Sequence, residues 1–300
     1  MEWQQLLGFY QVAKLGSFTK AAAATFRTQS ALSQQVKALE DELGTRLLDR
    51  LGKRRLKLTM AGEKLLACAQ GLLAQWEALQ DELRQLKGRH QGPLSLAAPF
   101  TTLYHLLPET LPAYLQAYPQ VELTLLDRDQ ASVFALVKAG DVDFGLALAS
   151  LVPLDLAALA WQPVDTVLLA PVGHPLTRVR RVTWRQIADY PLIVPPRGVE
   201  SGHRRLLEEQ FRKLGLAFRI ILESSNVELS ARYVETGLGL AFATLARGLP
   251  PERLRQVVFI PLSHYFKPDH LALVRRRDRE LTPYKQAFIN LLFGDRIVLQ

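Results

Sequence analysis

The sequence predicts a fold that is α/β overall: an N-terminal all-α winged helix-turn-helix, a long linker helix, and a larger α/β domain of two subdomains. Three observations predict it. Residues 3–43 hold three short segments with helical spacing of apolar side chains, residues 60–88 carry a heptad seam, and beyond residue 93 short apolar runs alternate with helical stretches. We place the domains at 1–60, 61–90 and 91–300, with subdomain I at about 91–162 and 267–300 and subdomain II at about 163–266.

Composition supports two folded cores and a polyanionic partner. The 300 residues are 48% hydrophobic, and 37 Lys and Arg against 29 Asp and Glu leave a formal charge of +8. The one cysteine, Cys68, excludes an intramolecular disulfide, which suits a reducing compartment, and we expect it to be a packing residue. We identify no signal peptide and no run of about 18 uncharged apolar residues, so we expect a cytoplasmic protein with no membrane partner.

The first two helices are short. Leu6, Phe9 and Val12 follow a helical pattern that Gly16 ends. Ser17 is a typical N-cap for a second helix, whose alanine run at 21–24 allows close packing against its neighbours.

The third helix, residues 30–43, has an apolar and a polar face. The apolar face carries Leu32, Val36, Leu39 and Leu43, and the polar face carries Ser30, Ser33, Gln34 and Lys37. Hydroxyl, amide and ammonium groups reach base edges and phosphates, and no acidic residue lies among them to repel DNA. An ordinary solvated helix face remains the alternative.

A cationic hairpin is predicted directly after this helix. Residues 50–57 hold five cations and no anion, and Gly52 allows a tight turn between extended pieces at 47–49 and 56–59. We interpret the hairpin as a wing that contacts the phosphate backbone. A solvated charge run is the alternative.

The linker helix carries an apolar seam at alternating steps of four and three. Its members are Leu65, Ala69, Leu72, Trp76, Leu79, Leu83 and Leu86, and the pattern ends at Gly88 and Gly92-Pro93. Such a stripe must pack on its own protein or on a second copy, and we favour dimerisation.

Nine short apolar runs predict the strands of the larger domain. They are 94–98, 121–126, 144–148, 167–171, 192–194, 220–222, 240–242, 257–260 and 271–274. We expect two mostly parallel sheets, with the chain crossing between them near 161–165 and returning near 264–269.

Several short motifs carry a resemblance. They are SFTKAA at 17–22, TQSALSQQVKALE at 28–40, LG at 43–44, LL at 47–48, Arg50 and LTMAG at 58–62. Residues 1–65 closely resemble, without a gap, the DNA-binding domain of LysR-type transcriptional regulators. The remainder is similar to the effector domain of that family through LP at 107–108, YP at 118–119, residues 136–144, HPL at 174–176 and residues 234–240.

The resemblance implies a sequence-specific regulator that binds promoter DNA as a homodimer or homotetramer, with RNA polymerase as a further candidate partner. Toward the DNA it places Arg27, Gln29, Ser30, Ser33, Gln34 and Lys37, and on the DNA backbone Arg50, Lys53, Arg54 and Arg55. The effector domain would resemble periplasmic binding proteins and hold a small-molecule inducer between its subdomains. No cofactor and no metal is implied.

The implied inducer site follows the ends of predicted strands. Its expected residues are Phe100, Thr101, Thr102, Gln130, Ser132, Ser201, Gly202, His203, Ser225 and Asn226. Free backbone N–H groups and hydroxyls at Thr101 and Thr102 would suit a carboxylate or another small anion, although both could be simple N-caps. These threonines and residues 233–240 resemble the cysteine-biosynthesis regulators of the family. Leu148, however, stands where those regulators carry a ligand-binding threonine, and this disfavours a sulfate-like or acetylserine-like inducer.

Other function classes fit less well. An enzyme is disfavoured because the sequence has no HExxH or GxxxxGK[ST] motif, and in residues 198–202 the serine stands one place late for a nucleophile elbow. The six histidines are scattered without metal-ligand spacing. A stand-alone solute-binding protein would lack a basic winged helix. A DNA-binding regulator whose effector domain is ligand-free and only oligomerises remains open.

Overall fold

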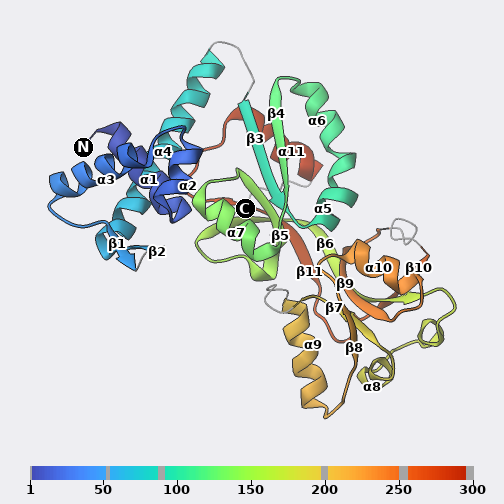
Figure 1. Cartoon of the computed structure of the whole chain (residues 1–300). Coiled ribbons are helices and arrows are strands. Elements are labelled where there is room, and N and C mark those ends of the chain that lie inside the picture. The colour runs from blue at the N-terminus through green and yellow to red at the C-terminus, as the bar shows by residue number, and fades with distance from the viewer. Residues whose placement is uncertain (1, 52–54, 87–91, 197–201, 250–255, 295–300) are drawn as a thin grey trace. The chain divides into compact units, whose positions relative to one another are not determined.

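The computed structural model describes residues 2–51, 55–86, 92–196, 202–249 and 256–294 (Figure 1). The chain divides into two compact units, residues 1–83 and 84–300. We call them the N-terminal unit and the larger unit, and each is described by itself.

The N-terminal unit contains the three predicted helices and the hairpin. Its elements are α1 (Trp3–Leu15), α2 (Phe18–Ala24), α3 (Gln29–Leu43), β1 (Leu48–Leu51), β2 (Arg55–Leu58) and most of α4 (Met60–Leu86). Phe9, Val12, Leu32, Val36 and Leu39 are buried together, as predicted, whereas Leu43, at the end of the predicted apolar face of α3, is 44% exposed. The side chains of Ser17 and Thr28 cap α2 and α3, and Gly16 and Gly44 adopt the left-handed conformation that ends α1 and α3.

The seam of α4 divides into two parts. Near its start, Leu65 packs against the helical core and Ala69 is fully buried. Further along, Leu72, Trp76, Leu79 and Leu83 are 37–50% exposed in the single chain. Cys68 is also exposed, so the expectation that it packs is wrong for the single chain: it lies beside the seam and not in it.

One half of the larger unit is built on strands β3 (Gly92–Ala98), β4 (Val121–Asp127), β5 (Phe144–Leu148) and β11 (Asp269–Arg276). One face of this sheet packs against α6 (Leu111–Ala117) and α11 (Pro283–Phe293), and the other against α7 (Gln130–Ala139). The short helix α5 (Phe100–His105) follows β3 and leads into η1 (Leu107–Glu109), and η2 (Ala149–Leu151) follows β5. We call this the first half.

The second half is built on β9 (Leu240–Ala246), β7 (Leu192–Val194), β8 (Ile220–Glu223) and β10 (Val257–Pro261). Helices α8 (Trp184–Ala188) and α9 (Gly202–Lys213) cover one face, with the short η3 (Pro175–Arg178) beside them. Helix α10 (Val227–Glu235) covers the other face. Each half is therefore a helix–sheet–helix sandwich with its own core.

All nine predicted strands are present, but two expectations about the sheets are wrong. The strands form one continuous sheet in the order β4-β3-β5-β11-β6-β9-β7-β8, with β10 on β6. The reason is β6 (Leu156–Pro171), which pairs with β11 as far as Val164 and with β9 from Val164 onward. Among the described residues this sheet has four parallel and four antiparallel strand pairs, because β6 and β11 run against their neighbours.

None of the helices in the described part of the chain combines the length and the apolar character needed to cross a membrane.

Candidate DNA-binding helix and effector pocket

The polar face of α3 is open in the single chain. Gln29, Ser30, Gln34 and Lys37 are exposed, and Ser33 is half-buried. Gln29 accepts a hydrogen bond from the Thr19 hydroxyl, and Ser30 lies 3.1 Å from the Thr28 hydroxyl, but no described group hydrogen-bonds to the side chains of Gln34 or Lys37. The predicted base-reading residues thus lie together at the start and along one face of α3.

The turn before α3 is braced from within. Arg27 donates to Gln35 of α3 at 3.0 Å and to Gln4 of α1, so its guanidinium connects two helices. The preceding residue, Phe26, has a φ of 53° and a side chain that is 99% exposed. The left-handed conformation is unfavourable for a phenylalanine backbone, and burial of the exposed ring does not offset this cost.

The side chain of Glu40 holds the start of the hairpin against α3. Glu40 of α3 accepts the N–H groups of Leu47 and Leu48 at 2.7 and 3.2 Å. Gly62 allows α4 to approach, since a Cβ there would lie 2.1 Å from the carbonyl oxygen of Leu47.

Two of the predicted wing cations lie on the strands of the hairpin. Arg50 pairs with Leu56 and Arg55 with Leu51 in the antiparallel ladder, and only the backbone of these two arginines is described. Lys53 and Arg54 lie outside the described residues.

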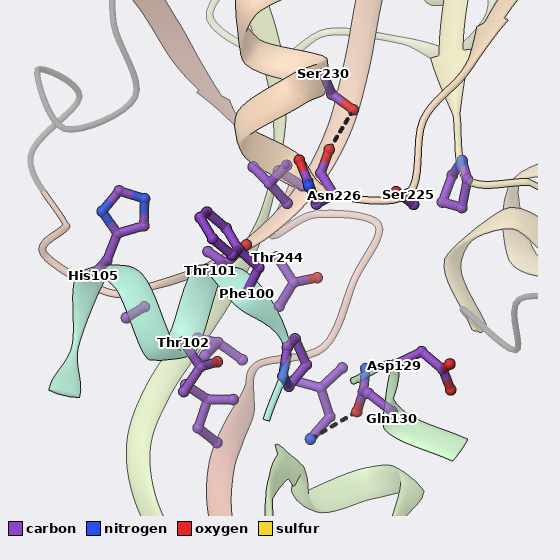
Figure 2. A pocket seen from close by; sticks show the side chains of 18 of the residues that line it. Phe100, Thr101, Thr102, His105, Asp129, Gln130, Ser225, Asn226, Ser230 and Thr244 are labelled. Carbon is purple, nitrogen blue, oxygen red and sulfur yellow. Dashed lines mark hydrogen bonds between the residues drawn. The ribbon is translucent and has the colours of Figure 1, made fainter. Parts of the chain in front are cut away.

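The larger unit encloses a pocket of about 410 Å³ (Figure 2). It lies at the carboxyl ends of β3, β4 and β5 in the first half and of β7 and β8 in the second half. Strand ends are where α/β sheets usually bind ligands, because helix N-termini and loops converge there. Of the ten predicted effector residues, the pocket brings together Phe100, Thr101, Thr102, Gln130, Ser225 and Asn226.

The first half supplies hydroxyl and amide groups. Gln130 uses its carbonyl oxygen to accept the backbone N–H of Leu148 at 2.9 Å, which leaves its amide N–H groups for the pocket. Thr102 is nearly buried, and no described group hydrogen-bonds to its hydroxyl. Leu148 itself lines the pocket, as an apolar side chain.

The second half offers a similar set. Asn226 caps α10 by accepting the N–H of Leu229 at 2.7 Å, so its amide N–H groups remain for a ligand. Its backbone oxygen accepts the hydroxyls of Ser224 and Ser230, which fixes the loop (Figure 2). Ser225, beside it, makes no hydrogen bond with a described side chain.

Four predicted effector residues are not among those that line the pocket. Ser132 donates its hydroxyl to Asp129 at 2.9 Å and belongs to the cap of α7. Ser201 lies outside the described residues, and of Gly202 and His203 only the backbone, in the first turn of α9, is described.

Sequence reasoning missed a polar contact between the two halves. Glu228 of α10 accepts the hydroxyl of Thr101 at 3.2 Å and lies 3.1 Å from Nε2 of His105, which is almost fully buried. We call these three residues the clasp. Because Thr101 has one hydrogen to donate and gives it to Glu228, it can only accept from a pocket ligand.

The charged residues of the pocket rim are Asp127, Arg128 and Asp129, all exposed. The backbone N–H of Ser132 holds the pKa of Asp129 below its ordinary value, since that N–H stabilises the carboxylate. Within the described part of the chain, no cluster of three His, Cys, Asp or Glu side chains could hold a metal ion.

Comparison with known families decides the identity of both units. Residues 3–63 match the bacterial regulatory helix-turn-helix family of LysR type, and residues 87–294 match the LysR substrate binding domain. The chain belongs to the LysR family of transcriptional regulators. It is therefore a DNA-binding regulator and not an enzyme.

Relatives of this LysR regulator include cysteine-biosynthesis types, which confirms the predicted resemblance. The HTH-type regulator Cbl of Escherichia coli K12 is 29% identical over 97% of this chain and 92% of its own length. The regulator CysB of Burkholderia cenocepacia is 29% identical over 92% and 88% of the two chains. A full-length OxyR variant from Pseudomonas aeruginosa, 22% identical, shares the fold with a TM-score of 0.67 over 99% of this chain and 98% of its own.

Proposed function

We propose that this LysR regulator binds promoter DNA through α3 and the wing, and that a small-molecule inducer in the pocket of the larger unit controls it. The observation that carries the proposal is the pocket itself. Its unsatisfied donors come from both halves, Thr102 and Gln130 from one and Ser225 and Asn226 from the other. A ligand bound there would change how the halves close.

The DNA-binding part of the proposal rests on α3. Its exposed polar face, Gln29 to Lys37, lacks acidic side chains, and the wing adds Arg50, Lys53, Arg54 and Arg55. We expect two copies to read half-sites about one turn of DNA apart, or a multiple of it.

A second copy of the chain would pack on α4. Leu72, Trp76, Leu79 and Leu83 recur along α4 at coiled-coil spacing and are about half exposed in the single chain. A homodimer through this seam, or a homotetramer of two such dimers, would remove this apolar surface from water. RNA polymerase would be the partner of the assembled regulator on the promoter.

The donors in the pocket indicate an inducer rich in oxygen atoms. Amide N–H groups of Gln130 and Asn226 and the hydroxyls of Thr102 and Ser225 suit a carboxylate or another small singly charged anion. Asp127 and Asp129 at the rim disfavour a ligand of high negative charge.

The second candidate is a regulator whose larger unit binds no ligand and only oligomerises. The clasp favours it, because Glu228 ties α5 to α10 by protein groups alone.

One experiment separates the two. The purified protein would select DNA from genomic and random fragments at two salt concentrations, and the genes beside the enriched sites would supply a panel of metabolites for thermal shift. An interrupted palindrome and one stabilising metabolite, whose effect Thr102→Val removes, support the proposal. No stabilising metabolite supports the ligand-free regulator, and DNA binding without sequence preference contradicts both.

A further inference from the structure

Four arginines lie close together in a short segment of the second half, away from the pocket-lining residues. Arg178 ends η3, Arg180 and Arg181 lie in the following turn, and Arg185 is on α8. All four are exposed. The sequence has no acidic residue between Asp165 and Asp189, so the segment carries no internal neutralising charge.

Core packing and hydrogen bonds hold the backbone of residues 178–185 in place. Val182 and Trp184 are buried, and Thr183 caps α8 in a reciprocal hydrogen-bond pair with Gln186. Nε2 of His264 lies 3.0 Å from the carbonyl oxygen of Val182 and holds the turn from another segment. Because the apolar side chains between the arginines point into the core, the arginines are directed outward.

More cations lie in the last turn of α9 and just before β8. The ring of Trp184 packs edge-on against Phe211 at 5.3 Å, and Phe211 stacks on Phe218 at 4.6 Å. Figure 1 shows α8 at the same end of the second half as the last turn of α9. We group the four arginines with the exposed cations that follow these two phenylalanines in the chain and call the set the Trp184 patch: Arg178, Arg180, Arg181, Arg185, Arg212, Lys213 and Arg219.

The patch carries an excess of positive charge in the described part of the chain. None of its seven cations forms an ion pair there, whereas Arg205 pairs with Glu209 at 2.9 Å and Arg232 pairs with Glu235. Four carboxylates lie within four positions of a patch cation. Asp189 is exposed, Arg204 holds Glu208 and Glu223, and Arg205 holds Glu209. Seven cations thus have four carboxylates near them in sequence, and three of these four are already paired with other arginines.

We propose that the Trp184 patch binds the phosphate backbone of duplex DNA, as a second and sequence-independent contact made by the larger unit. Arginine predominates in it, and guanidinium groups bind phosphate through two parallel hydrogen bonds. Duplex DNA carries one negative charge per about 1.7 Å of its axis, which matches a dense cationic surface. A protein partner fits less well, because the centres of protein interfaces are depleted in charged residues and the apolar side chains of residues 178–185 are turned inward.

The test measures the salt dependence of DNA binding by the full chain. The probe is a fluorescent 60-bp duplex of mixed sequence, and the variant is Arg180→Gln with Arg181→Gln. The slope of log affinity against log salt changes by about 0.9 per phosphate contact, so the variant should lose about 1.8. The matched control, Arg232→Gln with Arg247→Gln, removes the same charge from arginines of the same half that pair with Glu235 and Asp165, and it should keep the slope within about 0.5.

If the glutamine variant folds poorly, Arg180→Lys with Arg181→Lys is measured as well. This variant retains the charge, so it should keep most of the wild-type slope. A glutamine variant with the wild-type slope would overturn the proposal. If that variant also failed to support transcription by RNA polymerase in vitro, the patch would bind an acidic protein surface in place of DNA. Equal slope losses in the variant and the control would overturn the proposal too, since paired cations would then act alike.

Discussion

The clasp gives a prediction whose size follows from its geometry. Glu228 accepts two hydrogen bonds, from Thr101 at 3.2 Å and from His105 at 3.1 Å. Hydrogen bonds to a charged group each contribute about 1.5–3 kcal/mol. Glu228→Gln keeps one accepting oxygen and replaces the other by an amide NH₂, so one contact and the charge are lost. We expect the closed arrangement to lose about 1.5 kcal/mol, which is roughly a tenfold shift toward the open one.

Hydrogen exchange of the full chain measures this shift directly. Amides of α5 and of the first turn of α10 should exchange about tenfold faster in Glu228→Gln, because opening separates these two elements. The matched control is Glu235→Gln, at the other end of α10, where Glu235 pairs with Arg232 on the surface. Exposed helix pairs contribute about 0.2–0.5 kcal/mol, so exchange in α5 should change by less than about twofold.

Two results would refute the reasoning. Equal exchange in the two variants would show that Glu228 does not hold the halves together. A double variant, Glu228→Gln with His105→Gln, whose effects simply add would show that the two side chains are not coupled.

Further predictions concern both units. Gly62→Ala should lower the free energy of unfolding by about 1–3 kcal/mol in urea titration, since its Cβ would lie 2.1 Å from the Leu47 oxygen. Phe26→Asn should raise the melting temperature, because asparagine tolerates a φ of 53° better than phenylalanine; an unchanged value would argue against strain there. Gln34→Ala should reduce discrimination between DNA sites more than total affinity in a binding competition, and preserved discrimination would exclude Gln34 as a base-reading residue. Burial lowers the pKa of His174 from 6.5, so protonation favours the unfolded chain and stability should fall as pH drops below 6.5; His174→Asn should flatten that slope in pH-dependent unfolding.

Local periodicity predicted which elements exist. The apolar spacing of Leu32, Val36 and Leu39 gave α3 its buried face, and β-rich runs located every strand of the larger unit. Strand ends also predicted much of the pocket wall, such as Thr102 and Asn226, because loops after parallel strands converge.

The periodicity of a short segment cannot predict which distant segments of the chain pair with each other. The full length of β6 was missed because Pro163 interrupts its apolar pattern, although the strand continues to pair with β11 and β9 on either side. Glu228 and Thr101 are 127 positions apart, and nothing local in the sequence distinguishes this glutamate from a solvated one.

The position of β11 determines the order in which the larger unit can fold during synthesis. β11 lies between β5 and β6 in the sheet, and α11 places Tyr284, Phe288 and Ile289 in the core of the first half. Most of the second half, β6 to β10, is contiguous and leaves the ribosome earlier.

Until residues 269–293 have been synthesised, one edge of β5 therefore has no partner strand and the core of the first half is incomplete. An unpaired strand edge next to an open core favours exchange of the missing strand between neighbouring chains. A message truncated after β10 would yield a chain whose second half folds and whose first half cannot.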